Sequence, residues 1–173
     1  TVIVDGIPEQ VWTHRRQVEP LLVDLGLQLR GADLLSVNAR DSIHSGMLLE
    51  VSRAPTYRLL IDNRDIDVAS WGKTPVDVVR DAGLTIDHHD RVVINGNLAL
   101  PDVEHAQPAS SAQAITYARG YAWQALEKEP LTFRVYRAVP ISVSDGGLTF
   151  EVRATGQTVG EALRQANIVI YRG

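Results

Sequence analysis

The sequence predicts the α+β fold class: tandem small units in an elongated arrangement, each with a β-hairpin, one helix and returning strands. Three observations predict it. One stretch of sequence recurs three times, apolar and polar residues alternate at the start of the copies, and a pattern typical of a helix start follows. Three copies of one unit explain a chain of 173 residues better than a single large domain.

The copies align almost without interruption. A shift of 57 residues superimposes copy one on copy two without a gap, as at Val4 and Ile61, Gly26 and Gly83, and Asp33 and Asp90. Copy three begins at Ile141, and a shift of 84 residues aligns it with copy two after one extra residue in its turn. Repetition of this kind indicates one supersecondary unit used three times.

Each copy opens with a predicted β-hairpin. In copy three, apolar and polar residues alternate over 141–144 and 148–154, which is the period of strands with one buried face. Residues that tolerate positive φ stand between the two runs, at 145–147, and their counterparts lie at 5–6 and 62–63. These positions are predicted to form tight turns.

A helix is predicted after each hairpin. Thr158 and Glu161 form a capping-box pattern in copy three, and Thr74 takes the cap position in copy two. Copy one has Gln17 there, so its helix start is weaker. The apolar residues that follow recur at helical spacing and predict one stripe facing the hairpin. All three helices are predicted to stop at aligned residues that accept the left-handed conformation, which are Gly26, Gly83 and Asn167.

Short extended segments follow the helices, at 27–29, 84–86 and 168–170, and closing strands are predicted at 47–54 and 131–138. Hairpin, helix and returning strands describe a small β-grasp, or ubiquitin-like, unit. Copy three has no closing strand before Gly173, so we expect a truncated third unit and a fragment of a longer protein.

The predicted units are therefore repeat one at 1–54, repeat two at 55–138 and repeat three at 139–173. Repeat two carries an insertion at about 94–130, with 27 extra residues between Val93 and Leu131. The first part of the insertion, 101–111, is rich in proline and small polar residues and is predicted to be a loop. Apolar spacing over 112–129 favours a helix, although Gly120 interrupts it and a strand stays open as the alternative.

Composition excludes several classes of protein. The chain has 17 Lys and Arg against 21 Asp and Glu, with no run of like charges, so nucleic acid is not an expected partner. Apolar runs such as 21–23 are far too short to cross a bilayer, so we expect no membrane-spanning segment in this fragment. The absence of cysteine excludes disulfides and thiolate metal sites.

We predict no catalytic residue, no cofactor and no metal site, because the sequence carries no motif for any of them. His88, His89 and Asp90 are adjacent, but neighbours in an extended chain point apart, so we interpret them as a polar surface loop. Glu104 and His105 lie in the proline-rich loop and receive the same interpretation.

Aromatic and basic side chains leave alternatives open. Trp12, Trp71 and Trp123 offer faces that stack on sugars, but core or inter-repeat packing is the favoured interpretation. Arg53 and Arg137 stand just before the next hairpin in two copies. Contact with an anionic polymer is one interpretation, and hydrogen bonds to a neighbouring carbonyl or acid are the favoured one.

The hairpin with its Asp-Gly turn, the helix start at 158–163 and the extended piece after it resemble the repeats of the domain of unknown function 348. That family is a ubiquitin-like module found in tandem in YabE-like proteins and resuscitation-promoting factors. The resemblance is strongest at 141–168, good at 57–93 and fair at 2–37. It implies an extracellular or cell-envelope location, and it supplies no catalytic residue.

These inferences predict the non-catalytic spacer of a cell-wall-associated protein, which presents an adhesive or peptidoglycan-hydrolase module. The alternative is a module that binds peptidoglycan, another wall polymer or a cell-envelope protein, since exposed edge strands and tryptophans suit binding. An enzyme in its own right is disfavoured, because no nucleophile with a base and no metal cluster is recognised.

Overall fold

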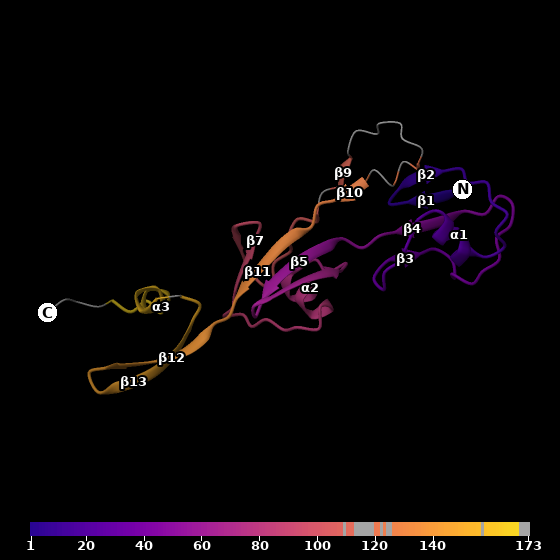
Figure 1. Ribbon diagram of the computed structural model, residues 1–173. Helices are drawn as coiled ribbons and strands as arrows, with labels where there is room; N and C mark the ends of the chain where they lie inside the picture. Colours follow the sequence, from indigo (N-terminus) through magenta and orange to yellow (C-terminus); the bar gives the residue numbers. More distant parts are fainter. Residues whose placement is uncertain (109, 113–119, 122, 124–125, 157, 170–173) are drawn as a thin grey trace. The chain divides into compact units, whose positions relative to one another are not determined.

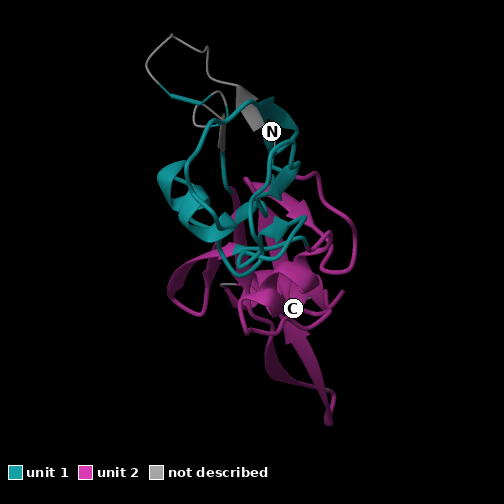
Figure 2. Cartoon of the chain, turned by 90° about the vertical axis from the view of Figure 1, so that its right-hand side faces the viewer, with its two compact units in different colours: residues 1–56, 69–71, 108–130 teal, residues 57–68, 72–107, 131–173 magenta. Residues whose placement is uncertain are grey.

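The computed structural model describes residues 1–108, 110–112, 120–121, 123, 126–156 and 158–169. Over these residues the protein is a mixed α/β structure with several small sheets and three helices, compatible with ubiquitin-like units (Figure 1). The chain divides into two compact units (Figure 2). Unit 1 comprises 1–56, 69–71 and 108–130, and unit 2 comprises 57–68, 72–107 and 131–173.

Unit 1 is built on a four-stranded sheet and one helix. Its elements are β1 (Val2–Val4), β2 (Ile7–Glu9), α1 (Val18–Asp24), β3 (Leu34–Leu35) and β4 (Leu49–Ser52). The strand order is β2-β1-β4-β3, with β1 antiparallel to β2 and parallel to β4. The predicted closing strand of copy one is therefore present as β4 and pairs with the first strand of the hairpin.

Unit 2 contains a five-stranded sheet with the same parallel pairing. Its elements are β5 (Thr56–Ile61), β6 (Arg64–Ala69), α2 (Pro75–Asp81), β7 (Arg91–Ile94), β8 (Asn97–Ala99) and β11 (Leu131–Tyr136). The order is β6-β5-β11-β7-β8, and the closing strand β11 runs parallel to β5. Buried residues from β5, α2, β7 and β11 form the core, including Leu59, Val79 and Phe133.

The C-terminal part of unit 2 is a separate two-stranded sheet followed by a helix. Its elements are β12 (Val139–Asp145), β13 (Leu148–Ala154) and α3 (Val159–Gln165). No third strand joins this pair among the described residues. Leu148 and Val159 are more than two-thirds exposed, so this region buries much less apolar surface than the five-stranded sheet.

The hairpin turns confirm the turn prediction and correct the alignment of copy three. Residues 5–6 and 62–63 take positive φ, as do Gly146 and Gly147 at 56° and 84°. Asp145 pairs with Leu148, so the third turn has two residues and not three. The turn therefore contains no extra residue. Gly146 and Gly147 are sufficient to form it, because glycine readily adopts the left-handed geometry that a two-residue turn requires. A shift of 84 therefore holds throughout, and Gly146 stands where Asp62 stands in copy two.

The helix starts behave as predicted. The Thr74 and Thr158 hydroxyls accept hydrogen bonds from the backbone N–H groups of Asp77 and Glu161, at 3.3 and 3.2 Å. Gln17 makes no side-chain cap. Instead, carbonyls of a later loop accept from the first donors of α1: the Val18 N–H bonds the Asp41 carbonyl at 3.1 Å and the Glu19 N–H bonds the Ala39 carbonyl at 2.8 Å.

The helix ends agree with the sequence as well. Gly26, Gly83 and Asn167 all have positive φ, at 72°, 74° and 57°. The residue directly after each of them donates its backbone N–H to the helix carbonyl five residues earlier, as Leu84 does to Val79. The N···O distances are 2.9–3.0 Å in the three copies. This is the bonding of a Schellman motif, which satisfies the last helical carbonyls. The segments 27–29 and 84–86, which follow and were expected to be extended, join no sheet.

The insertion differs from the prediction. Two short strands, β9 (Ser110–Ala112) and β10 (Leu126–Lys128), pair antiparallel, so the predicted helix over 112–129 is wrong at both of its ends. Cross-strand pairing there satisfies the backbone groups that a helix interrupted by Gly120 would satisfy poorly. The rest of that segment lies largely outside the described residues. The insertion also begins with a hairpin, β7–β8, which turns at Asn95–Gly96.

Candidate functional site

A buried aspartate organises the place where the closing strand β11 ends. Asp90 is 6% exposed. One carboxylate oxygen accepts the backbone N–H of Ala138 at 2.8 Å, and the other accepts from the Asp87 N–H at 2.9 Å and from Arg137 at 2.9 Å. The carboxylate therefore joins the loop after α2 to the exit of β11, the point where the chain leaves the sheet.

Arg137 completes this cluster from the exit itself. Its guanidinium donates to both Asp62 oxygens, at 2.9 and 2.8 Å, and to the Thr85 carbonyl at 2.6 Å. The hydrogen bond from Arg137 lowers the pKa of Asp62 below its ordinary value. One side chain thus ties the hairpin turn, the loop after the helix and the strand exit together, with the planar donor geometry that favours arginine over lysine.

Unit 1 builds the same tie from the aligned residues. Asp33 accepts the Ala54 N–H at 2.8 Å and the Arg30 N–H at 2.8 Å, as Asp90 does for Ala138 and Asp87. Asp5 in the turn binds the Arg53 backbone N–H at 2.8 Å and its Nε at 2.7 Å. In unit 1 two arginines bind the strand exit, because Arg30 also donates to the Ala54 carbonyl at 2.6 Å.

The favoured interpretation of Arg53 and Arg137 is confirmed, since each hydrogen-bonds a nearby carboxylate. We call the two sets the exit clusters: Asp5, Asp33 and Arg53 with Arg30, and Asp62, Asp90 and Arg137. The β12–β13 turn has Gly146 at the corresponding position and so lacks the turn aspartate. Sequence alignment had superimposed Asp33 on Asp90, but it did not show that the two carboxylates bind strand exits.

Two segments of the chain match a known family. Residues 1–39 and 141–172 match the family model described as the G5-linked ubiquitin-like domain, which is the domain of unknown function 348. Over these two segments, which make up less than half of the chain, the protein is similar to that family. The resemblance noted from the sequence is thereby confirmed, for segments that include the first and third hairpin and helix. No curated protein and no solved structure gives a significant match.

The histidine loop between α2 and β7 departs from the sequence interpretation. The rings of His88 and His89 lie 3.8 Å apart, and both Nδ1 atoms approach the same Asp87 oxygen, at 2.8 and 3.0 Å. The argument that neighbours point apart is wrong here, because the loop is a tight turn closed by the bond from the Asp90 N–H to the Asp87 carbonyl at 2.9 Å. Asp90 itself faces the exit cluster.

Asp87, His88 and His89 are the described residues that offer a possible metal-ligand set, with ligand atoms within 4.8 Å of one another. The surroundings disfavour a cation. Arg153 already donates to the second Asp87 oxygen at 2.7 Å, and His88 is 74% exposed. Hydrogen bonds from the backbone and side chain of His89 lower the pKa of Asp87 to about 2. The loop is therefore a surface hydrogen-bonded turn.

His105 does not lie in solvent as the sequence interpretation held. It packs edge-on against Tyr57 and Phe133, with ring centroids 5.3 and 4.9 Å away, and its Nε2 lies 3.2 Å from the Tyr57 hydroxyl. Burial lowers the pKa of His105 below its ordinary value. Glu104 is exposed, as expected. The proline-rich loop thus packs the His105 ring against core aromatic residues, which the polar composition of the loop did not predict.

The three tryptophans have three different environments. Trp123 is fully buried in the unit 1 core and stacks on Tyr121 at 4.5 Å. Trp71 is 44% exposed and donates its indole N–H to the Ala32 carbonyl at 2.7 Å. Trp12 is 93% exposed at the rim of a hollow of about 460 Å³ in unit 1. The packing interpretation is confirmed for Trp123 and wrong for Trp12. Among the described residues, no helix has the length and apolar character needed to cross a membrane.

Proposed function

We propose that this chain is a non-catalytic spacer of a cell-envelope protein, made of tandem β-grasp units at 1–54, 55–138 and 139–173. Its work is mechanical: it holds a functional module, adhesive or wall-cleaving, away from the point of attachment. The location would be extracellular or in the cell envelope, as the resemblance to the ubiquitin-like family implies.

The observation that carries the proposal is the pair of exit clusters. A spacer must transmit direction from one unit to the next, so the chain must leave each sheet in a fixed way. Asp33 and Asp90 hold the backbone N–H groups of Ala54 and Ala138 at 2.8 Å, directly after the closing strands β4 and β11. These contacts fix the exits at aligned places in two copies.

Connector length supports the same proposal. Only residues 53–55 separate β4 from β5, and only 137–138 separate β11 from β12. A connection this short has little conformational freedom, and Pro55 restricts it further. Each closing strand therefore leads almost directly into the first strand of the next hairpin. A flexible tether would instead contain a longer glycine- and serine-rich segment.

Spin-label distances test the proposal, because a chain without cysteine accepts labels only where cysteines are introduced. Labels at the exposed positions of Arg40→Cys and Glu151→Cys are expected to give a narrow distance distribution, and small-angle scattering an elongated particle. Asp33→Ala with Asp90→Ala should broaden the distribution, while Asp102→Ala, an exposed site, should not. A compact particle, or a parent distribution as broad as that of the double variant, would refute the spacer.

A second candidate function rests on Trp12. An indole face that is 93% exposed beside a hollow lined by Arg15 and His44 suits stacking on a sugar ring. This candidate is a wall-polymer binding module. Retention on purified cell wall that Trp12→Ala abolishes, and that a Val103→Ala change at another exposed apolar side chain leaves intact, would support it. No retention above that of an unrelated protein would remove it. Muramidase or esterase turnover by the chain would overturn the non-catalytic assignment.

A further inference from the structure

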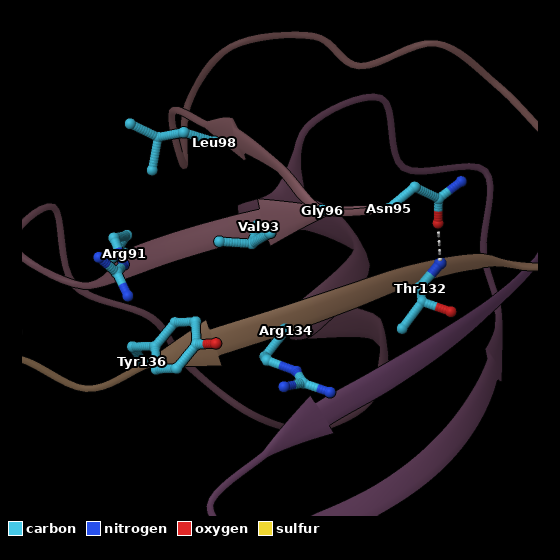
Figure 3. Close-up of a pocket in the computed structure, with 8 residues that line it drawn as sticks. All are labelled: Arg91, Val93, Asn95, Gly96, Leu98, Thr132, Arg134 and Tyr136. Atoms are coloured by element: carbon cyan, nitrogen blue, oxygen red, sulfur yellow. Dashed lines mark hydrogen bonds between the residues drawn. The ribbon is translucent and has the colours of Figure 1, made fainter. Parts of the chain in front are cut away.

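A shallow hollow lies on the outer face of the five-stranded sheet, away from its core. Its volume is about 560 Å³, and strands β7, β8 and β11 supply its lining (Figure 3). Arg91, Arg134 and Tyr136 stand along it in Figure 3, with Val93 and Leu98 beside them. None of these residues takes part in the exit clusters.

Strand alternation explains why this set gathers on one face. Phe133 and Val135 point into the core, so their neighbours Arg134 and Tyr136 point outward. In the sheet register Arg134 lies opposite Val93, which lies opposite Leu98, and Tyr136 lies opposite Arg91. The lining therefore includes one row of side chains across β11, β7 and β8 and a second row across β11 and β7.

The charge of the hollow is uncompensated. The lining contains two arginines and no carboxylate. Arg58 and Arg137, on the same sheet or at its end, each form an ion pair with an aspartate. Within the described part of the chain, no ion pair involves Arg91 or Arg134. The Arg91 guanidinium lies over the Tyr136 ring, 4.5 Å from its centroid, and its Nε is buried without a hydrogen-bond partner.

The other lining groups select the shape of the partner. Leu98 is 71% exposed, and with Val93 it offers an apolar surface suited to the C–H face of a ring. The Asn95 side-chain oxygen, Oδ1, accepts from the Thr132 backbone N–H at 2.9 Å. The side-chain NH₂ group of Asn95 is left as a donor. The lining thus offers more donors than acceptors, since the Thr132 and Tyr136 hydroxyls can act as either, and it suits a ligand with many oxygen acceptors.

From these contacts we propose that the hollow binds a carboxylate-bearing saccharide. The arginines would bind the carboxylate through charge-assisted hydrogen bonds, and the apolar row would contact the sugar ring. Arg91 is held in place by Tyr136 before any ligand arrives, so less side-chain freedom is lost on binding. This activity goes beyond the proposed spacer, because it would attach the sheet face to an acidic polymer.

Tetragalacturonate is the probe, with uncharged maltotetraose and inorganic phosphate as comparison ligands. We expect tetragalacturonate to shift the amide resonances of β7, β8 and β11 and to bind more weakly as salt is raised. Arg91→Gln with Arg134→Gln should weaken binding by about tenfold or more. Arg40→Gln changes one charge at an exposed residue of unit 1 and should leave binding unchanged.

Three results would overturn the assignment. The first is no shift at those amides with tetragalacturonate. The second is equal affinity of the double arginine variant and the parent, with the variant shown to be folded by its unchanged amide spectrum elsewhere. The third is binding of maltotetraose or phosphate as tight as that of tetragalacturonate, since the carboxylate or the sugar would then be irrelevant.

Discussion

The β5–β6 hairpin and the β12–β13 hairpin begin from matched sequences and reach different degrees of burial. Each is followed by a threonine-capped helix that stops at a left-handed residue, Gly83 or Asn167. Leu59 is fully buried in the core to which β11 and α2 contribute, whereas the aligned Val143 is only half-buried. Likewise Val79 is fully buried and the aligned Leu163 half-buried.

The difference lies in one strand. Beside β5 lies β11, which pairs in parallel and contributes Phe133 and Val135 to the core. No described strand lies beside β12 in that position. Hairpin and helix therefore form from local signals, namely turn residues, caps and alternation, but the core needs a strand from far along the sequence. A small unit without that strand buries less apolar surface, so we expect it to be less stable.

The largest expected effect concerns the buried side chains themselves. Leu59→Ala removes a fully buried side chain and should lower the free energy of unfolding of the five-stranded sheet by about 2–5 kcal/mol. Leu163→Ala, at a half-buried site, should cost clearly less, because solvent already reaches the residue. Chemical denaturation with hydrogen exchange resolved by residue measures both. Equal losses would mean that the β12–β13 region has a core as closed as that of its counterpart.

A smaller loss is expected from the exit cluster. Asp90→Ala leaves the buried Ala138 N–H without its acceptor and removes one partner of Arg137, which should cost about 1–3 kcal/mol. Asp90→Asn keeps one acceptor and should cost less. The same pair of changes at Asp33 should act on unit 1. Urea denaturation of all four variants measures the effect, and a neutral Asp90→Ala would show that the carboxylate is not needed at the exit.

Much of this fold was predictable, because its signals are local. The turns at 5–6 and 62–63, the caps at Thr74 and Thr158 and the stops at Gly26 and Gly83 all follow from backbone preferences of single residues. The closing strands were predictable from alternation alone. Such features depend on neighbours a few residues away, so tertiary context did not override them.

The errors arise where distant contacts decide. His105 lies in the insertion and packs against Tyr57 and Phe133, which are far away in sequence. Polar composition made its segment resemble a solvated loop. Of the exit clusters, the sequence indicated the aligned aspartates and the hydrogen-bonding role of Arg53 and Arg137. It did not indicate the acceptor role of Asp90, because that role depends on where β11 ends. The Arg91 and Arg134 hollow gave no motif, since strand pairing alone brings its lining together.

The aromatic cluster predicts a pH dependence specific to the five-stranded sheet. Burial lowers the pKa of His105, so the unfolded chain binds the proton more readily than the folded one. Stability should therefore be full above the ordinary pKa of about 6.5 and should fall as the pH drops below it. His105→Phe should remove this slope, while His14→Gln, at an exposed position, should not. Denaturation midpoints between pH 8 and 5 decide the matter.

The smallest expected effect is a change in the pKa of Asp87. It separates the contribution of the His89 backbone N–H from that of the His89 ring. The His89 backbone N–H donates to Asp87 at 3.1 Å and the His89 ring at 3.0 Å, and together they lower the carboxyl pKa to about 2. His89→Ala keeps the backbone donor, so the pKa should rise only part of the way to 3.8. Because the folded pKa is depressed, the stabilisation is present above about pH 4 and is lost as the pH falls toward 2. Carboxyl ¹³C shifts measured against pH would give both values. A parent Asp87 that titrates near its ordinary value, or a His89→Ala variant that loses the whole shift, would show that the turn backbone does not hold this carboxylate.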